Sequence, residues 1–271
     1  MTEQRKKIEE SVDFIKNEMP KNFKPSIAVI TDKEIPLPQG FKVLGKIPVS
    51  DTEHGGDFIL GKYSNRDTII IKGRIHFYDG FSMREIAHFI YVLKELGVKK
   101  IISIDEAGHL NPRFKCGELA LVYDHINLTG DNPLIGENDD KLGIRFPDMS
   151  NAYDRDTFEK AYKIFQNQKV KINESVYIGL IGPETETEAE ARFYREIGGD
   201  VAGYSFIPEN IAAVHSETKF LGICLITREL LADKMAEDNS SEEELEKFKN
   251  ENLKKAIKEL NKIYGDLIKN L

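Results

Sequence analysis

Residues 69–81 place three side chains suited to ligand binding just after a run of apolar residues. The stretch reads "IIIKGRIHFYDGF", so Arg74, His76 and Tyr78 are each separated by one residue. Side chains of a β-strand alternate between its two faces, and a strand that continued through Tyr78 would present all three on one surface. The guanidinium is a planar fork of donors that suits oxyanions. The segment predicts a ligand-binding surface at the end of a strand.

Further polar clusters follow other predicted strands. They are "DEAGHLNP" (105–112), "RFPDMSNAYD" (145–154), "GPETETEAE" (182–190) and "GYSFIPE" (203–209). Open α/β sheets bind their ligands at the carboxyl ends of the strands. We therefore expect these clusters to meet around one site.

Strand and helix signals alternate along the chain. Apolar, β-branched runs predict strands at 26–31, 67–73, 98–104, 118–127, 175–182, 201–205 and 220–227, and apolar residues at helical spacing predict helices at 82–97, 154–168, 186–199 and 207–217. Two further amphipathic helices are expected at the ends, within 1–20 and 240–271. The alternation predicts an α/β fold, with residues 1–271 forming a single domain around a central mixed β-sheet flanked by helices.

Composition narrows the class of protein. A net charge of −8 argues against a general nucleic-acid or anionic-membrane binder. No apolar run approaches the roughly 20 residues that span a bilayer, and the charged N-terminal residues do not resemble a signal peptide. Cys116 and Cys224 lack the spacing of a zinc site and are expected to be buried thiols in a reducing compartment. These features predict a cytoplasmic protein that binds no metal.

Taken in order, the clusters resemble the trimeric purine nucleoside phosphorylase family, which includes the methylthioadenosine phosphorylases. The family shows, in order, the patterns G-R-x-H-x-Y-E-G-Y, N-A-A-G-G-L-N-P, D-H-I-N-L, R-F-x-x-M-S-x-A-Y-D, G-P-x-x-E-T-x-A-E, G-M-S-x-x-P-E and S-L-I-T-N. The corresponding stretches of this sequence are, in the same order, "GRIHFYDGF", "DEAGHLNP", "DHINL", "RFPDMSNAYD", "GPETETEAE", "GYSFIPE" and "CLITR". The resemblance covers roughly residues 26 to 235. It implies a nucleoside phosphorylase-like fold, a homotrimer, and phosphorolysis of a purine nucleoside to free base and ribose 1-phosphate. Inorganic phosphate is the implied co-substrate, and no cofactor is implied.

The resemblance also implies roles for individual residues. The residues that match phosphate-side positions are Lys33, Arg74, His76, Glu106 and Ser205. Those that match sugar-side positions are His54, Tyr78, Tyr204 and Phe146, the last being an aromatic that the family lends to a neighbouring subunit. Base-side positions are matched by Thr185, Glu186 and Arg228, and the catalytic set is expected to be His76, Glu186 and Arg228.

The sequence departs from the family at the site itself. Where the family has a glycine-rich phosphate loop, this chain has "TDKE", with Asp32 at the place of the anion and Lys33 as a partial substitute. Glu106 replaces an alanine beside phosphate, and Arg228 replaces an asparagine of the base site, where it could pair with Glu186. Three hypotheses stay open: a phosphorylase with a remodelled site, a nucleoside hydrolase in which Glu106 or Asp32 activates water, and a paralogue that binds a ligand or partner.

Overall fold

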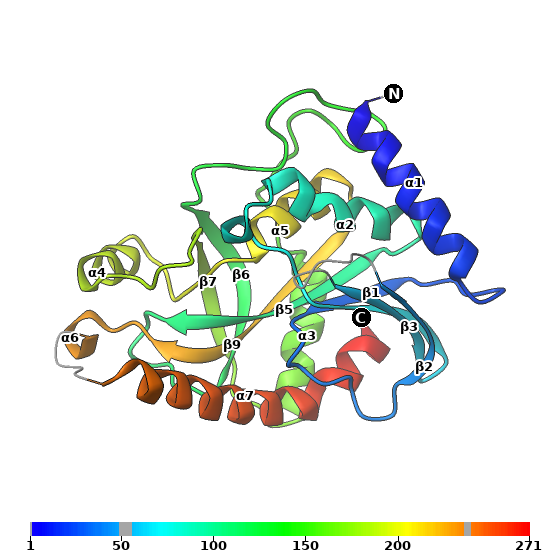
Figure 1. The fold of residues 1–271 in the computed structure, drawn as a ribbon. Coiled ribbons are helices and arrows are strands. Elements are labelled where there is room, and N and C mark those ends of the chain that lie inside the picture. Colours follow the sequence, from blue (N-terminus) through cyan, green and yellow to red (C-terminus); the bar gives the residue numbers. More distant parts are fainter. Residues whose placement is uncertain (1, 49–55, 236–239) are drawn as a thin grey trace.

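A mixed β-sheet runs through the protein (Figure 1). The computed structural model describes residues 2–48, 56–235 and 240–271, and these contain a nine-stranded sheet. Its strands are β1 (Ile27–Thr31), β2 (Lys42–Pro48), β3 (Asp57–Tyr63), β4 (Arg66–Lys72), β5 (Lys100–His109), β6 (Leu119–Asn127), β7 (Asn173–Gly179), β8 (Val201–Gly203) and β9 (Lys219–Glu229).

The order of the strands brings several carboxyl ends to one edge. The sheet runs β2-β3-β4-β1-β5-β8-β7-β6-β9, and a further pairing of β5 with β9 closes the last five strands into a ring. β1 is parallel to β4 and β5, and β5 is parallel to β9. The chain therefore leaves β1, β4 and β9 close to the central strand β5, and the polar clusters that follow these strands converge.

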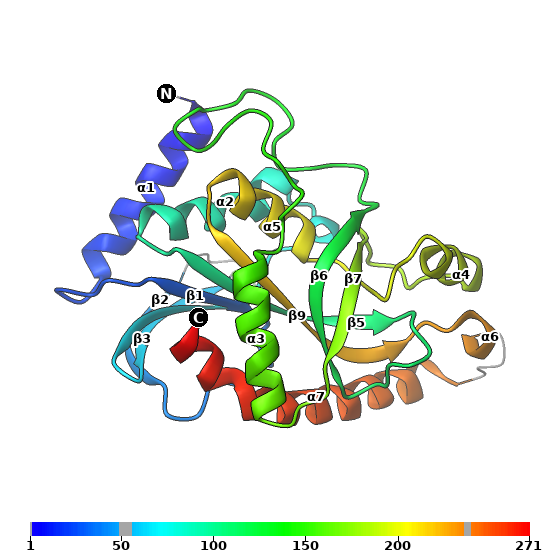
Figure 2. The same cartoon turned by 180° about the vertical axis from the view of Figure 1, so that it is seen from behind.

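Helices cover both faces of the sheet. They are α1 (Glu3–Glu18), α2 (Met83–Glu95), α3 (Arg155–Asn167), α4 (Glu188–Glu196), α5 (Phe206–His215), α6 (Ala232–Met235) and α7 (Glu242–Asn270), with a single 3-10 turn, η1 (Phe77–Asp79). In β1, Ala28 and Ile30 join the core beneath α1, α2 and α5, whereas Ile27 and Val29 join the core beneath α3 and α7. Figures 1 and 2 show these two helical layers on opposite sides of the strands. The fold is α/β, as the sequence predicted.

The long helix α7 forms because its start is capped and one face is apolar. The Ser241 hydroxyl accepts a hydrogen bond from the Glu244 amide, and the Glu244 carboxylate accepts one from the Ser241 amide, which completes a capping box. Leu253, Leu260 and Leu267 lie on the apolar face and are buried in the core that also includes β9. None of the helices in the described ranges could span a membrane.

Arg74, His76 and Tyr78 do not share one face of a strand, because β4 ends before them, close to the end of the predicted strand 67–73. β4 ends at Lys72, and the next residue, Gly73, has φ 103°, a backbone conformation that side-chain-bearing residues rarely adopt. The Gly73 amide donates to the carbonyl of Thr31, which holds the turn against the end of β1. The chain then enters η1, where the His76 and Tyr78 rings stack with centroids 4.6 Å apart. The glycine therefore turns Arg74 into the protein while His76 and Tyr78 form a separate aromatic pair.

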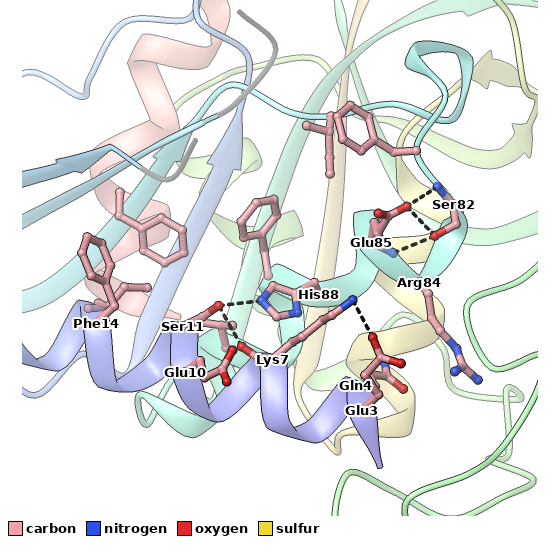
Figure 3. A pocket seen from close by; sticks show the side chains of 16 residues that line it. Glu3, Gln4, Lys7, Glu10, Ser11, Phe14, Ser82, Arg84, Glu85 and His88 are labelled. Atoms are coloured by element: carbon pink, nitrogen blue, oxygen red, sulfur yellow. Dashed lines mark hydrogen bonds and ion pairs between the residues drawn. The ribbon is translucent and has the colours of Figure 1, made fainter. Parts of the chain in front are cut away.

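A groove of about 830 Å³ lies between α1 and α2 (Figure 3). Its floor is apolar, and its polar groups pair locally. The Ser11 hydroxyl lies 2.9 Å from His88 Nε2, and Lys7 pairs with Glu3 at 3.0 Å. The groove contains none of the predicted site residues, so the candidate site is the smaller pocket at the strand ends.

Candidate active site

The predicted site residues converge on a cavity of about 420 Å³ at the carboxyl ends of β1, β4, β5, β8 and β9. The predicted residues that line it are Lys33, Arg74, His76, Tyr78, Glu106, Tyr204, Ser205 and Arg228. Asp32, Asp105, Thr227 and Lys249 also line it. Strand ends that are far apart in sequence thus supply one cavity, as the sequence analysis expected of an α/β fold.

Arg74 is buried, and protein groups accept from each nitrogen of its guanidinium. Nε donates to Glu209 Oε1 at 2.8 Å, and Nη1 donates to Asp32 Oδ1 at 2.9 Å. Nη2 donates to the Ser103 hydroxyl, and two backbone carbonyls of β1 and β5 accept further bonds. Burial acts to lower the pKa of Arg74, but the carboxylates of Glu209, Asp32 and Asp105 outweigh it and raise that pKa. The cation expected to bind phosphate is thus already paired with protein carboxylates.

Burial raises the pKa of three carboxyl groups that line the cavity. The pKa of Asp32 rises to about 6, because burial and the neighbouring Asp105 outweigh the opposing effect of Arg74. The pKa of Asp105 is also raised by burial, and Asp105 Oδ1 lies 3.9 Å from the same guanidinium. Burial likewise raises the pKa of Glu106, whose Oε2 is 3.6 Å from Lys249 Nζ. The cavity wall can therefore take up protons close to neutral pH.

Two hydroxyl groups in the cavity are buried without a well-formed hydrogen bond. Ser205 is 3% exposed and Thr227 is fully buried, and neither hydroxyl oxygen has a partner of acceptable geometry within the described residues. They lie near Asp105 and Glu106 and help to lower the pKa of those groups, against the larger effect of burial. Buried polar atoms nearly always find a partner, so these hydroxyls indicate a place for a polar ligand or water.

A second ion pair closes the end of the cavity where the base is expected. Arg228 Nη1 donates to Glu186 Oε2 at 2.9 Å, so the pairing expected from the sequence is present. The Tyr204 hydroxyl donates to Glu186 Oε1 at 3.2 Å and accepts from Arg228 Nη2 at 3.3 Å. Burial raises the pKa of Tyr204 to about 12. Arg228 lines the cavity but Glu186, with a side chain 2% exposed, does not.

The other predicted residues lie outside this cavity. Thr185 is exposed and is not part of the cavity lining. Phe146 is 84% exposed and lines a separate depression beside Arg145, whose guanidinium lies 5.4 Å from the ring centre. His54 falls outside the residues that the structure describes. Within those residues, no group of three or more His, Cys, Asp or Glu side chains could hold a metal ion.

Glu209 and Lys249 are among the residues of the site that were not identified from the sequence. Glu209, the partner of Arg74, stands in the otherwise apolar helical stretch "FIPENIAAV", where a lone buried acid requires a cation. Lys249 reaches Glu106 from α7 and lies one helical turn before Leu253, on the face that packs against the sheet. The sequence contained a signal for each of them. Glu209 is an acid within an apolar run, and Lys249 is a lysine on the apolar face of a helix.

Asp32 is expected to make the stability of the protein depend on pH. Its pKa is about 6 in the folded protein and 3.8 ordinarily, so the folded state retains a proton that the unfolded state has already lost. The free energy of unfolding should therefore fall as pH rises from about 4 to above 6. Asp32→Asn removes this titration. The free energy of unfolding of Asp32→Asn, relative to that of the wild type, should therefore rise by about 2–3 kcal/mol between about pH 4 and pH 7.5.

Urea unfolding of both proteins at the two pH values measures this difference. Arg74, Asp105 and His76 face Asp32 and titrate or hold charge in both proteins, so the comparison isolates the Asp32 carboxyl. Glu34→Gln removes an exposed acid nearby and should show no such gain. A difference between Asp32→Asn and wild type that stays constant with pH would contradict the prediction.

Comparison with known proteins places the chain in a family. Residues 27–265 match the family described as the Phosphorylase superfamily. Purine nucleoside phosphorylase 1 of Bacillus subtilis (strain 168) is 39% identical over 229 residues, which cover 82% of this chain and 84% of the relative.

Solved structures agree with this match. The structure of Schistosoma mansoni purine nucleoside phosphorylase in complex with inosine has a TM-score of 0.84 at 28% identity, covering 97% of this chain and 96% of the other. That of isoform 2 from the same organism, in complex with cytosine and ribose-1-phosphate, has a TM-score of 0.84 at 31% identity and the same coverage. Together with the site geometry, these matches show that the chain belongs to the purine nucleoside phosphorylase family of the Phosphorylase superfamily.

Proposed function

We propose that this chain cleaves the N-glycosidic bond of a purine nucleoside by phosphorolysis, giving the free base and ribose 1-phosphate. The observation that supports this most directly is the single cavity that brings together Arg74, His76, Tyr78, Tyr204 and Ser205 in a member of this family. Homologous structures contain inosine in one case and ribose-1-phosphate in another. The reaction uses inorganic phosphate as co-substrate and needs no cofactor.

Different side chains of the cavity surround the sugar, the phosphate and the departing purine. The Tyr78 and Tyr204 rings meet edge to face, 6.0 Å apart, and form the wall against which the sugar packs. Phosphate binds near His76 and Ser205, below the sugar. The anionic groups there stabilise the positive charge that develops on the ribose, and Arg228 stabilises the negative charge that develops on the departing purine.

Phosphate binding requires a rearrangement around Arg74. The guanidinium pairs with Asp32, so phosphate reaches it only when Asp32 turns aside or takes up a proton. A pKa of about 6 places that protonation near neutral pH. Burial and the nearby Arg74 lower the pKa of His76, which leaves its imidazole neutral and able to exchange one proton with a phosphate oxygen.

The enzyme is further proposed to be a cytoplasmic homotrimer that binds neither nucleic acid nor membranes. The Phe146 side chain is 84% exposed, which leaves this ring available to a neighbouring sugar pocket. The net charge of −8 supports the exclusion of nucleic acid.

Product analysis tests the proposal. Inosine, guanosine and adenosine are incubated with the protein at several phosphate concentrations, and ribose 1-phosphate is measured directly. We expect ribose 1-phosphate to form in proportion to bound phosphate, and Ser205→Ala to raise the KM for phosphate about 10-fold by removing a hydroxyl donor. The matched control is Ser150→Ala, at an exposed position in a separate loop. Failure to form ribose 1-phosphate from any purine nucleoside would contradict phosphorolysis.

A further inference from the structure

We propose that the same cavity also hydrolyses the N-glycosidic bond, with the Asp32 carboxylate activating a water molecule in the space where phosphate would bind. This inference rests on the proposed function for the binding of the nucleoside, but it names a second nucleophile. The products are then the free purine and free ribose.

The first argument is the charge of the cavity wall. Arg74, the buried cation, is paired with Asp32 and Glu209. Four more carboxyl groups line the cavity, those of Glu34, Asp79, Asp105 and Glu106. Its other cations are Lys33, Lys249 and Arg228, of which Lys249 is paired with Glu106 and Arg228 with Glu186. A phosphate dianion is repelled by such a wall, whereas a neutral water molecule is not. The cavity therefore favours water as the group that attacks the sugar.

The second argument is the placement of Asp32. Arg74 holds one of its oxygens at 2.9 Å, which fixes the carboxylate at the end of β1. Its side chain is 19% exposed and lines the cavity, so the carboxylate is accessible to a water molecule. Its pKa of about 6 leaves it ionised at neutral pH, close to the value that suits a general base. Glu106 is less suited because its charge is engaged by Lys249.

The third argument concerns the hydrogen bonding of two buried hydroxyl groups and does not depend on charge. The buried hydroxyls of Ser205 and Thr227 lack well-formed hydrogen bonds and lie in the lining of the same cavity. A water molecule can donate to one group and accept from another, and so it can complete the hydrogen bonding of hydroxyls whose contacts with neighbouring carboxyl groups are poorly formed. The site is thus polar, buried and adjacent to a fixed carboxylate, as the activation of water requires.

The reaction balances with water alone. One O–H bond of water breaks and its proton passes to Asp32, while the oxygen forms a bond to C1′ of the ribose. The C1′–N bond breaks, and its electron pair leaves with the purine, beside Arg228. The purine takes a proton from solvent, and Asp32 returns its proton to solvent. No oxidant, reductant or further reactant is needed.

Asp32→Asn tests the inference because it affects the two activities in opposite directions. In phosphate-free buffer, the wild type should release free ribose together with the purine. Asp32→Asn should slow this release by about 100-fold or more, the usual contribution of a general base. The same substitution should raise kcat/KM for phosphate about 10-fold, since one like charge is removed and Arg74 is released.

Controls separate this inference from the proposed phosphorolysis. Glu159→Gln removes an exposed acid of α3 that does not line the cavity and should leave ribose release unchanged. Asp32→Ser provides a second variant, and thermal unfolding checks that both Asp32 variants fold. Absence of free ribose in the wild type, or equal release by the folded Asp32 variants, overturns hydrolysis. Ribose 1-phosphate formation at added phosphate reports on phosphorolysis separately.

Discussion

Replacing Arg74 by methionine is expected to lower the free energy of unfolding by about 3–5 kcal/mol, the usual cost of removing one partner of a buried ion pair. The guanidinium makes five hydrogen bonds and its side chain is 3% exposed. Without it, the carboxylates of Glu209 and Asp32 are left close together with no cation between them. Urea unfolding at neutral pH, followed by circular dichroism, measures the loss.

Two further proteins make this test specific. Arg113→Met alters an exposed arginine and should change stability by no more than about 0.5 kcal/mol. Arg74→Met/Glu209→Gln removes both members of the shortest ion pair and should recover part of the loss, with a coupling energy of about 1–3 kcal/mol. A loss below about 1 kcal/mol for Arg74→Met would show that the network contributes little to stability.

Replacing Arg228 by asparagine is expected to strengthen the binding of hypoxanthine and inosine by about 10- to 100-fold. In the present structure Glu186 is engaged by Arg228 and Tyr204 and does not line the cavity. The substitution frees one carboxylate oxygen to accept from an N–H group of the purine. A hydrogen bond to a charged group contributes about 1.5–3 kcal/mol, which corresponds to this gain in affinity.

Titration calorimetry with hypoxanthine, and the KM for inosine, measure the effect. Arg113→Asn is the matched control, because it makes the same change of side chain at an exposed position far from the cavity lining. Arg228→Asn should also be less stable than the wild type when no ligand is bound, and hypoxanthine should restore the loss. Weaker binding by Arg228→Asn would show instead that the guanidinium itself holds the base.

The parts of the fold that could be predicted from sequence are those with strong local patterns. Buried strands such as β1 and β4 are continuous β-branched runs, and α2 begins with a capping box at Ser82. β2 and β3 were missed: β2 is mostly exposed along its length, and each strand contains a glycine that interrupts the run. Their pairing with β4 is a property of the assembled sheet.

The candidate site also has features that the sequence could predict and features that it could not. Motif spacing could predict that Arg74, Ser205 and Tyr204 meet, because each follows a strand whose end lies at the same edge. It could not predict that Arg74 is occupied, since Glu209 lies 135 residues away along the chain. Whether the strand continues through Tyr78 could not be decided from side-chain alternation, which gives no warning of the positive φ at Gly73.

The filled coordination of Arg74 has a consequence for how the protein behaves as cellular conditions change. A protein that leaves a buried cation for a ligand to neutralise becomes more stable as the ligand concentration rises. This chain supplies the neutralising carboxylates itself, from β1 and α5. Its unliganded folded state therefore needs no bound anion to neutralise Arg74, and the protein should fold in phosphate-free buffer.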